Sequence, residues 1–193
     1  MGTHCAYFCF MGADCAHFLL NKVILMQKTT RFLTRAAMIA TLYVALTYLQ
    51  NFLIPNSATW AIQFRASEAL CVLALFTPAA IPGLTIGCFL FNISFMGALP
   101  LDFLVGTLAS FLAAGGMFLT RNCTVKGYPL LALLMPAFSN SLLVGWELNL
   151  YIGGGFWLNA LYVAIGEVAV LLSLGSALFY GMKAQNLDKR LFN

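Results

Sequence analysis

Residues 66–99 of the chain, ASEALCVLALFTPAAIPGLTIGCFLFNISFMGAL, decide its fold. The stretch is almost entirely apolar, and Pro78 and Pro82 break it in the middle, because a proline removes a helical hydrogen bond and clashes with the preceding turn. A helix that crosses a bilayer needs about 20 apolar residues. The stretch is therefore long for one straight crossing and short for two.

The composition of the whole chain indicates that its solvent is lipid. Hydrophobic residues make up 62% of the 193 positions, charged residues make up 8%, and the mean hydropathy is +0.90. A water-soluble domain of this composition would expose large apolar patches. Nearly the whole chain is used in membrane spans, which leaves no room for a soluble catalytic or nucleotide-binding domain.

The basic residues choose between one and two crossings for residues 66–99. Four other spans are clear, at residues 32–54, 101–119, 129–152 and 157–182. Cytoplasmic loops are enriched in Lys and Arg. Two short crossings joined at TPAAIP put nine of the ten basic residues in the cytoplasm and leave Arg65 alone outside. We therefore expect an all-α membrane protein of six transmembrane helices, with both termini in the cytoplasm.

The first 25 residues are expected to form a separate N-terminal extension. They are apolar, but His4, Asp14 and His17 interrupt them, and they lack the basic start of a signal peptide. A more ordinary beginning follows at Met26. We therefore divide the chain into an extension, residues 1–25, and a transmembrane domain, residues 26–193.

The sequence shows no pattern typical of nucleic-acid binding, of a CxxC cysteine pair or of an ATP-binding loop. The net charge is +4, but the basic residues are scattered at segment ends and do not form a nucleic-acid-binding stripe. No two of the six cysteines have CxxC spacing, which favours small buried hydrophobes. The chain has no GxxxxGK[ST] loop, so we expect no cofactor in it and energy from a partner or a gradient.

Five ionisable residues remain near or within the bilayer, where each costs free energy if it faces lipid. Four of them lie toward the external side in the six-span topology, and the fifth lies nearer the midplane. This clustering predicts a polar pocket open to the outside. Alternatively, the first two, three residues apart at a helix start, pair only with one another. In chain order the five are Arg65, Glu68, Asp102, Glu147 and Glu167.

Helical spacing adds two amides to this pocket. Asn140 lies seven residues before Glu147, and Asn159 lies eight before Glu167, so each pair shares one helical face. A carboxylate accepts two parallel N–H donors from the amidine edge of a guanine-like base. The pocket is therefore suited to a planar, donor-rich ligand that is neutral or cationic.

Aromatic residues are expected at the same external end. Trp157, Tyr151 and Tyr162 are placed to stack on a flat ring, and Trp60 in the first external loop is placed to close over it. The alternative explanation is an interfacial aromatic belt.

The first span carries two neighbouring ridges of small residues. Ala36 and Ala40 form one, and Ala37, Thr41 and Ala45 form the other. Small residues at four-residue spacing allow another helix to approach closely. Ordinary packing within the bundle explains the same spacing.

Five stretches together resemble a known family. They are TRAAMIATLYVALTYL, IQFRASEAL, AIPGLTIGC, GALPLDFLVGTLAS and LVGWELNLYIGGGFWLNALYVAIGE, which fall within residues 34–167. These stretches are similar to the substrate-binding S components of energy-coupling factor (ECF) transporters, and among them to the queuosine precursor transporter group, QueT.

The resemblance implies a six-helix S component in the plasma membrane that captures its substrate from outside. Such a subunit docks on a transmembrane T component that carries two ATPase subunits, so ATP is used by the partners. The alanine motif, here Ala36 and Ala40, would face the T component. The first external loop would bring Trp60, Gln63 and Arg65 near the ligand.

The implied ligand is a 7-deazaguanine base, in cyano or aminomethyl form. An alternative within the same architecture is an S component for another vitamin, such as thiamine or riboflavin. An alternative from another class is a small intramembrane enzyme, but no nucleophile–base or metal-ligand spacing is visible in the sequence.

Overall fold

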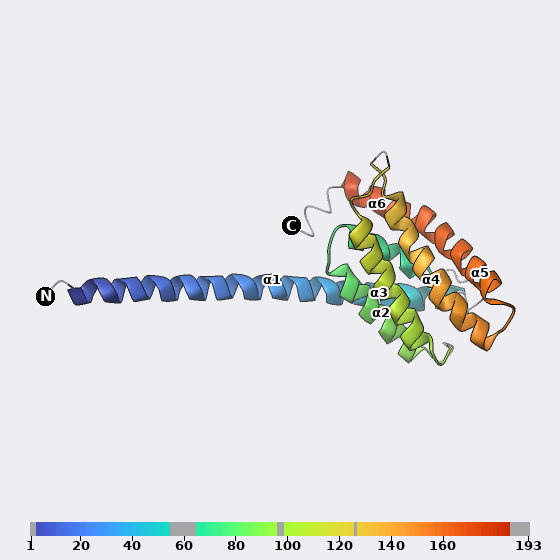
Figure 1. The fold of residues 1–193 in the computed structure, drawn as a ribbon, viewed down its shortest axis with the longest axis horizontal. Helices are drawn as coiled ribbons and strands as arrows, with labels where there is room; N and C mark the ends of the chain where they lie inside the picture. The colour runs from blue at the N-terminus through green and yellow to red at the C-terminus, as the bar shows by residue number, and fades with distance from the viewer. Residues whose placement is uncertain (1–2, 55–64, 96–98, 126, 186–193) are drawn as a thin grey trace. The chain divides into compact units, whose positions relative to one another are not determined.

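The computed structural model describes residues 3–54, 65–95, 99–125 and 127–185, with side chains from Met26 onward. Within these ranges every regular element is a helix, as the composition predicts (Figure 1). Contacts divide the chain into two units, Met1–Arg35 and Ala36–Asn193.

The first helix, α1, runs from Thr3 to Leu53. It continues through the boundary that the sequence suggested after residue 25. The part of α1 that is long and apolar enough to cross a membrane is Met26–Leu53. Within the first unit, the hydroxyl of Thr34 donates a hydrogen bond to the carbonyl oxygen of Thr30, so its polar atom is satisfied inside the helix.

The second unit contains the remaining helices. Two of them, α3 (Asp102–Thr120) and α4 (Leu130–Tyr151), agree with the expected spans to within one residue at each end. The last expected span is a continuous helical run made of α5 (Phe156–Val170), a π-helical turn η2 (Leu171–Gly175) and α6 (Ser176–Ala184).

Residues 66–94 form two helices, with the break between them near the central prolines, as predicted. The first is a 3-10 helix, η1 (Ala66–Leu75), and the second is α2 (Ala80–Ser94). A 3-10 run of this length is uncommon. With rises of about 2.0 and 1.5 Å per residue, the two helices are roughly 20 and 22 Å long, shorter than a hydrocarbon core of about 30 Å.

Four helices of the described chain are long and apolar enough to span a membrane. Six crossings, and the cytoplasmic location of both termini, stay predictions. The membrane-spanning candidates are Met26–Leu53, Asp102–Thr120, Leu130–Tyr151 and Phe156–Ala184.

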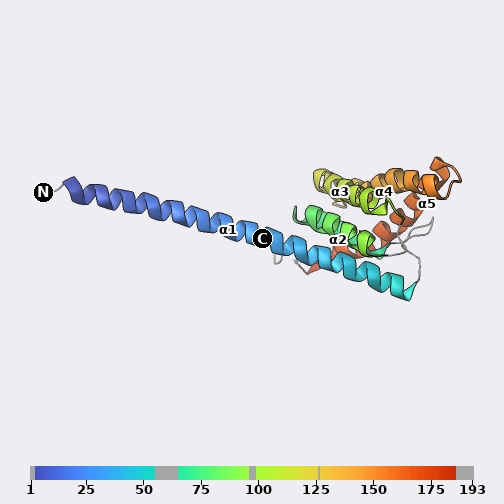
Figure 2. The ribbon, with the colours of Figure 1, turned by 90° about the horizontal axis from the view of Figure 1, so that it is seen from below.

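The α2 helix packs closely on α1 through two glycines (Figure 2). A Cβ atom at Gly83 would lie 2.7 Å from the carbonyl oxygen of Ala36, and one at Gly87 would lie 2.8 Å from the Cβ of Tyr43. Ala36 and Ala40 are therefore buried inside the bundle, with exposures of 4% and 6%. The side chains of the second ridge, Ala37, Thr41 and Ala45, are exposed.

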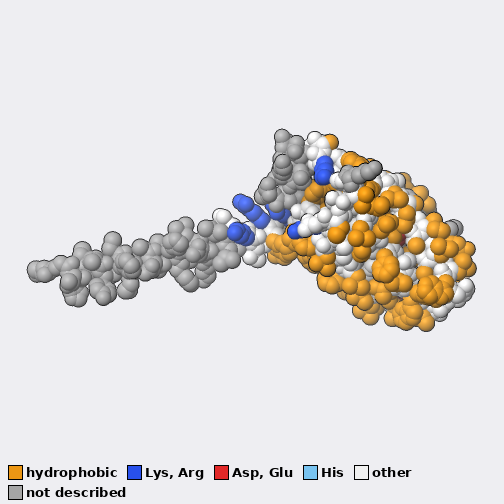
Figure 3. Space-filling view, turned by 45° about the horizontal axis from the view of Figure 1, so that its top comes forward, with side chains coloured by type: hydrophobic (Ala, Val, Ile, Leu, Met, Phe, Trp, Pro, Cys, Tyr) orange, Lys and Arg blue, Asp and Glu red, His pale blue; other side chains and the backbone are white. Residues whose placement is uncertain are grey.

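The other helices surround η1. The α3 helix packs between α2 and α4, and α4 packs on α5. The residues of η1 from Ser67 to Ala74 are all buried, and η1 contacts α2 through α6 as well as η2. Hydrophobic side chains cover much of the outer surface of the bundle (Figure 3), as expected for a protein whose surroundings are lipid.

The α1–α2 contact predicts a difference between two identical substitutions. Gly87→Ala is expected to destabilise the bundle by about 1–3 kcal/mol, since the new methyl group is too close to α1 to be accommodated without a shift. Gly115→Ala in α3 is the matched control, because a Cβ there has no atom within 4 Å.

Thermal unfolding of the two variants in detergent measures the difference. Gly115→Ala is expected to be neutral or to stabilise by roughly 0.5–1 kcal/mol, because alanine favours helix. Equal melting temperatures for the two variants would refute the close contact.

Candidate functional site

The five ionisable residues that the sequence placed near the bilayer are all inside the bundle. None of them is more than 4% exposed, and they come from four helices or their ends. Among the described residues, the interior of the bundle therefore holds four carboxylates and one guanidinium. We call Arg65, Glu68, Asp102, Glu147 and Glu167 the acidic cluster.

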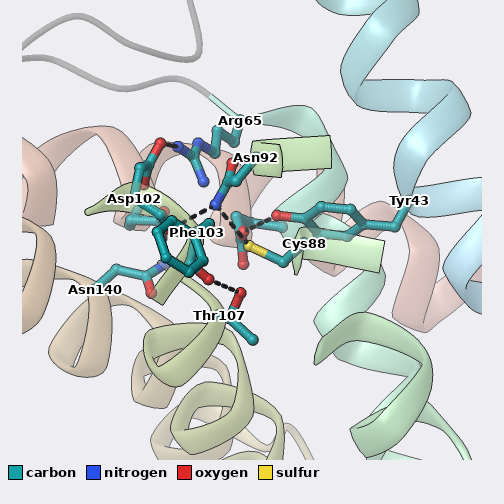
Figure 4. A network of polar contacts seen from close by, with 10 residues as sticks. Tyr43, Arg65, Cys88, Asn92, Asp102, Phe103, Thr107 and Asn140 are labelled. Atoms are coloured by element: carbon teal, nitrogen blue, oxygen red, sulfur yellow. Dashed lines mark hydrogen bonds and ion pairs between the residues drawn. The ribbon is translucent and has the colours of Figure 1, made fainter. Parts of the chain in front are cut away.

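Arg65, immediately before η1, is paired with the first residue of α3. Its Nη2 lies 3.3 Å from Oδ2 of Asp102. The side-chain amide of Asn92, from α2, donates to the backbone oxygen of Asp102 at 2.9 Å (Figure 4). The alternative in which Arg65 and Glu68 pair only with one another is therefore wrong. The pairing joins residues 37 positions apart in the chain.

Gly106, one turn into α3, leaves space for this arrangement. A Cβ atom there would lie 2.7 Å from the side-chain nitrogen of Asn92 and 2.9 Å from Oδ1 of Asp102. A larger residue at this position would displace one of the two polar groups.

Glu68 accepts hydrogen bonds on both of its oxygens. The hydroxyl of Tyr43 reaches from α1 and donates to Oε1 at 2.7 Å (Figure 4). The thiol of Cys71 donates to Oε2 at 3.3 Å. Glu68 is thus held between α1 and its own helix, and Cys71 is a buried hydrogen-bond donor and not one partner of a disulfide.

The carboxylates of α4 and α5 are less well satisfied. Asn140 donates from its side-chain nitrogen to Oε1 of Glu167 at 2.8 Å. The other oxygen of Glu167, both oxygens of Glu147 and Oδ1 of Asp102 are buried and have no hydrogen-bond partner within the described chain. All four of these unpaired atoms are acceptors.

Asn159 is buried, as its spacing predicts, but its amide is already engaged. It donates to the carbonyl oxygen of Gly153 at 2.8 Å. Gly153 lies in the turn between α4 and α5, so Asn159 holds this turn in place.

Electrostatic interactions connect the cluster through Arg65. The guanidinium interacts with Asp102 and Glu68, and also with Glu147 and Glu167. One cation cannot compensate four carboxylates in a medium of low dielectric constant. Each buried acceptor without a donor costs about 1–3 kcal/mol, and more if it is charged. The arrangement favours a ligand that brings N–H donors or positive charge.

Of the aromatic residues expected at the external end of the pocket, those that the structure describes are exposed or partly exposed. The side chain of Trp157 is 78% exposed and packs against Phe156 with the ring centroids 4.9 Å apart. Tyr151 is exposed and Tyr162 is partly exposed. An aromatic belt therefore describes Trp157 better than a contact with the ligand. Trp60 and Gln63 lie outside the described residues.

Two residues of the site were not predicted. Tyr43 shares a helical face with Ala36 and Ala40, and this spacing is the signal that identifies it as inward-facing. Asn92 is the one amide side chain of α2, and a polar side chain in such an apolar segment marks an interior position.

Charged residues enclosed in an apolar helical bundle are typical of membrane proteins that bind or pass a polar solute. The fold and the acidic cluster together indicate a multi-pass membrane transport protein. A family model described as QueT transporter matches residues 33–184. The chain belongs to this family, which confirms the resemblance seen in the sequence. Comparison with curated proteins and with solved structures gives no match.

The hydrogen bond between Tyr43 and Glu68 predicts a stability difference between two tyrosines. Tyr43→Phe is expected to destabilise the protein by about 1–3 kcal/mol, because it leaves a buried carboxylate oxygen without a donor. Tyr48→Phe is the control, since its hydroxyl bonds to Ser94 at an exposed position. Thermal unfolding compares the two variants, and an equal effect would contradict the buried interaction.

Proposed function

We propose that this chain is the S component of an ATP-driven ECF importer and that the acidic cluster binds a queuosine precursor, a 7-deazaguanine base, captured from outside the cell. Membership of the QueT transporter family supports the transporter class. The observation that carries the ligand class is the surplus of buried acceptors from α3, α4 and α5.

The guanine-like edge of the ligand supplies what these acceptors lack. It presents two parallel N–H donors, and a carboxylate accepts such a pair with one hydrogen bond to each oxygen. Glu147 has both oxygens without a partner among the described residues, so we assign it to this edge. Glu167 has one unpaired oxygen and is assigned to a further donor, such as the ammonium of the aminomethyl form.

The remaining polar residues are assigned supporting parts. Asn140 orients Glu167 through its hydrogen bond. Arg65 and Glu68 stabilise the charge and shape of the site, and Asp102 anchors Arg65. Trp60, in the first external loop, stays a proposed ligand contact. Trp157 is left out, because its side chain points away from the interior.

The ligand assignment predicts the effect of neutralising either carboxylate. Glu147→Gln and Glu167→Gln are each expected to weaken binding more than tenfold, since a charge-assisted hydrogen bond contributes roughly 1.5–3 kcal/mol. Trp157→Phe, at an exposed position, is expected to leave the affinity unchanged.

Calorimetric titration of the purified protein measures these affinities. The ligands are the cyano and aminomethyl deazaguanines, with thiamine and riboflavin as the competing vitamins. Tight binding of a vitamin with no binding of either deazaguanine would exclude the ligand assignment. Unchanged affinity in both glutamate variants would exclude the site.

The burial pattern of α1 favours a docking face for the T component other than the expected one. The alanine pair expected to face the partner, Ala36 and Ala40, is buried against α2 within this chain. The exposed small-residue ridge of α1 is Ala37, Thr41 and Ala45. We therefore propose this ridge as the surface that a partner helix approaches.

Tryptophan substitution tests this surface. Ala37→Trp or Thr41→Trp is expected to leave ligand binding intact and to abolish ATP-dependent uptake, because a bulky side chain separates the two subunits. Leu161→Trp, on the exposed face of α5, is the control and should still support uptake. Normal uptake by all three variants would rule out the ridge as the docking face.

A further inference from the structure

A second polar feature lies at the opposite end of η1 from the acidic cluster. Arg65 precedes η1 and Phe76 follows it, so the two ends are separated by roughly 20 Å at the rise of a 3-10 helix. Here the end of η1, the residues between α3 and α4, and α6 line a cavity of about 160 Å³ that is open on one side, with Arg121, Thr124 and Lys183 exposed. Its lining includes Phe76, Arg121, Thr124, Phe179 and Lys183.

The two cations of this cavity have defined positions. The guanidinium carbon of Arg121 lies 4.0 Å from the centroid of the Phe118 ring. The ammonium of Lys183 lies 4.8 Å from the centroid of the Phe179 ring. Such cation–π contacts hold the charge over an aromatic face without neutralising it.

No carboxylate compensates these two charges in the described part of the chain. The Asp and Glu residues whose side chains the structure describes all belong to the acidic cluster, and the one ion pair found among these residues joins Arg65 to Asp102. Two positive charges that line one cavity without a negative partner favour an anionic ligand.

Two of the residues that line the cavity, Phe76 and Phe179, are aromatic, and the neighbouring Tyr128 packs against Phe179. Phe76 stacks on Phe179 with the ring centroids 5.9 Å apart, and Tyr128 meets the edge of Phe179 at 6.0 Å. The hydroxyl of Tyr128 is hydrogen-bonded to Ser176 of α6. The lining of the cavity thus combines aromatic side chains with two cations and the hydroxyl of Thr124.

The surface beside the cavity is apolar as well. Leu119 and Leu130, near the two ends of the α3–α4 connection, are exposed large hydrophobic residues, and so is Tyr180 of α6. In a membrane protein such residues contact acyl chains. A ligand that meets both the cations and this surface carries a phosphate and hydrocarbon chains together.

We propose that this cavity binds the phosphate of an anionic phospholipid headgroup, with the acyl chains along the neighbouring apolar surface. Basic pockets between transmembrane helices bind lipid headgroups in this way. The site is separate from the acidic cluster and does not depend on which substrate the protein carries. A soluble phosphate compound shares the chemistry of the headgroup, but it has no acyl chains that would contact the apolar surface.

Native mass spectrometry of the full chain in detergent tests the proposal. The probes are phosphatidylglycerol, the zwitterionic phosphatidylcholine and free glycerol phosphate. The test variant is Arg121→Gln with Lys183→Gln. The control is Lys28→Gln with Arg31→Gln, which removes the same charge from exposed positions on the N-terminal part of α1.

We expect the unmodified protein to bind phosphatidylglycerol more tightly than phosphatidylcholine. The affinity of the test variant for phosphatidylglycerol is expected to be lower by about tenfold or more, because each basic residue near an anionic lipid contributes about 1 kcal/mol. The control should keep the affinity of the unmodified protein. Equal binding of the two lipids, or an equal loss in the control, overturns the proposal. Glycerol phosphate bound as tightly as the lipid would overturn the lipid assignment. Unchanged melting temperatures show that both variants are folded.

Discussion

The ion pair between Arg65 and Asp102 places a guanidinium among four carboxylates in the interior of an apolar bundle. Removing such groups from water costs far more than a single pair returns, so the surrounding structure has to satisfy each of them. Several features of the fold follow from this requirement. The start of η1 lies next to the start of α3, Asn92 binds the same turn from α2, and Gly106 keeps the space that both polar groups need. Tyr43 brings α1 to Glu68 for the same reason. The interior of the bundle thus combines these polar contacts with a packed hydrophobic core, whereas its outer surface is largely apolar.

The acidic cluster has more hydrogen-bond acceptors than donors. Its unpaired carboxylate oxygens among the described residues belong to Asp102, Glu147 and Glu167. Two departures from α-helical geometry lie close to it. Glu68 sits within the 3-10 helix η1, and Glu167 lies one turn before the π-helical turn η2, which itself contacts η1. Short π-helical segments are frequent at functional sites, and a 3-10 stretch often marks a functional hinge or a sequence under strain. In this chain the two segments carry or adjoin Glu68 and Glu167, which come from different helices and interact electrostatically.

The sequence was informative where a property depends on neighbouring residues. Apolar length located α3 and α4, the prolines located the break after η1, and seven- and eight-residue spacing identified the inward faces of α4 and α5. Properties set by distant contacts were not predictable. The partner of Arg65 lies 37 residues away, and the 3-10 geometry of η1 depends on the helices that surround it. Two ridges of small residues on α1 have the same spacing. Only Gly83 and Gly87 on α2 determine that Ala36 and Ala40 face inward.

The geometry of η1 also limits how this segment can change in length. A 3-10 helix has three residues per turn, so side chains three positions apart lie directly above one another. Glu68 and Cys71 are such a pair. Insertion or deletion of a single residue would rotate every later side chain by about one third of a turn and would turn buried faces toward the wrong neighbours. A change of three residues would preserve every face and alter only the length, by about 6 Å. A change of one residue in this segment is therefore expected to be more disruptive than a change of three residues. The surrounding α-helices have 3.6 residues per turn, so no whole-residue change of one turn preserves every face there.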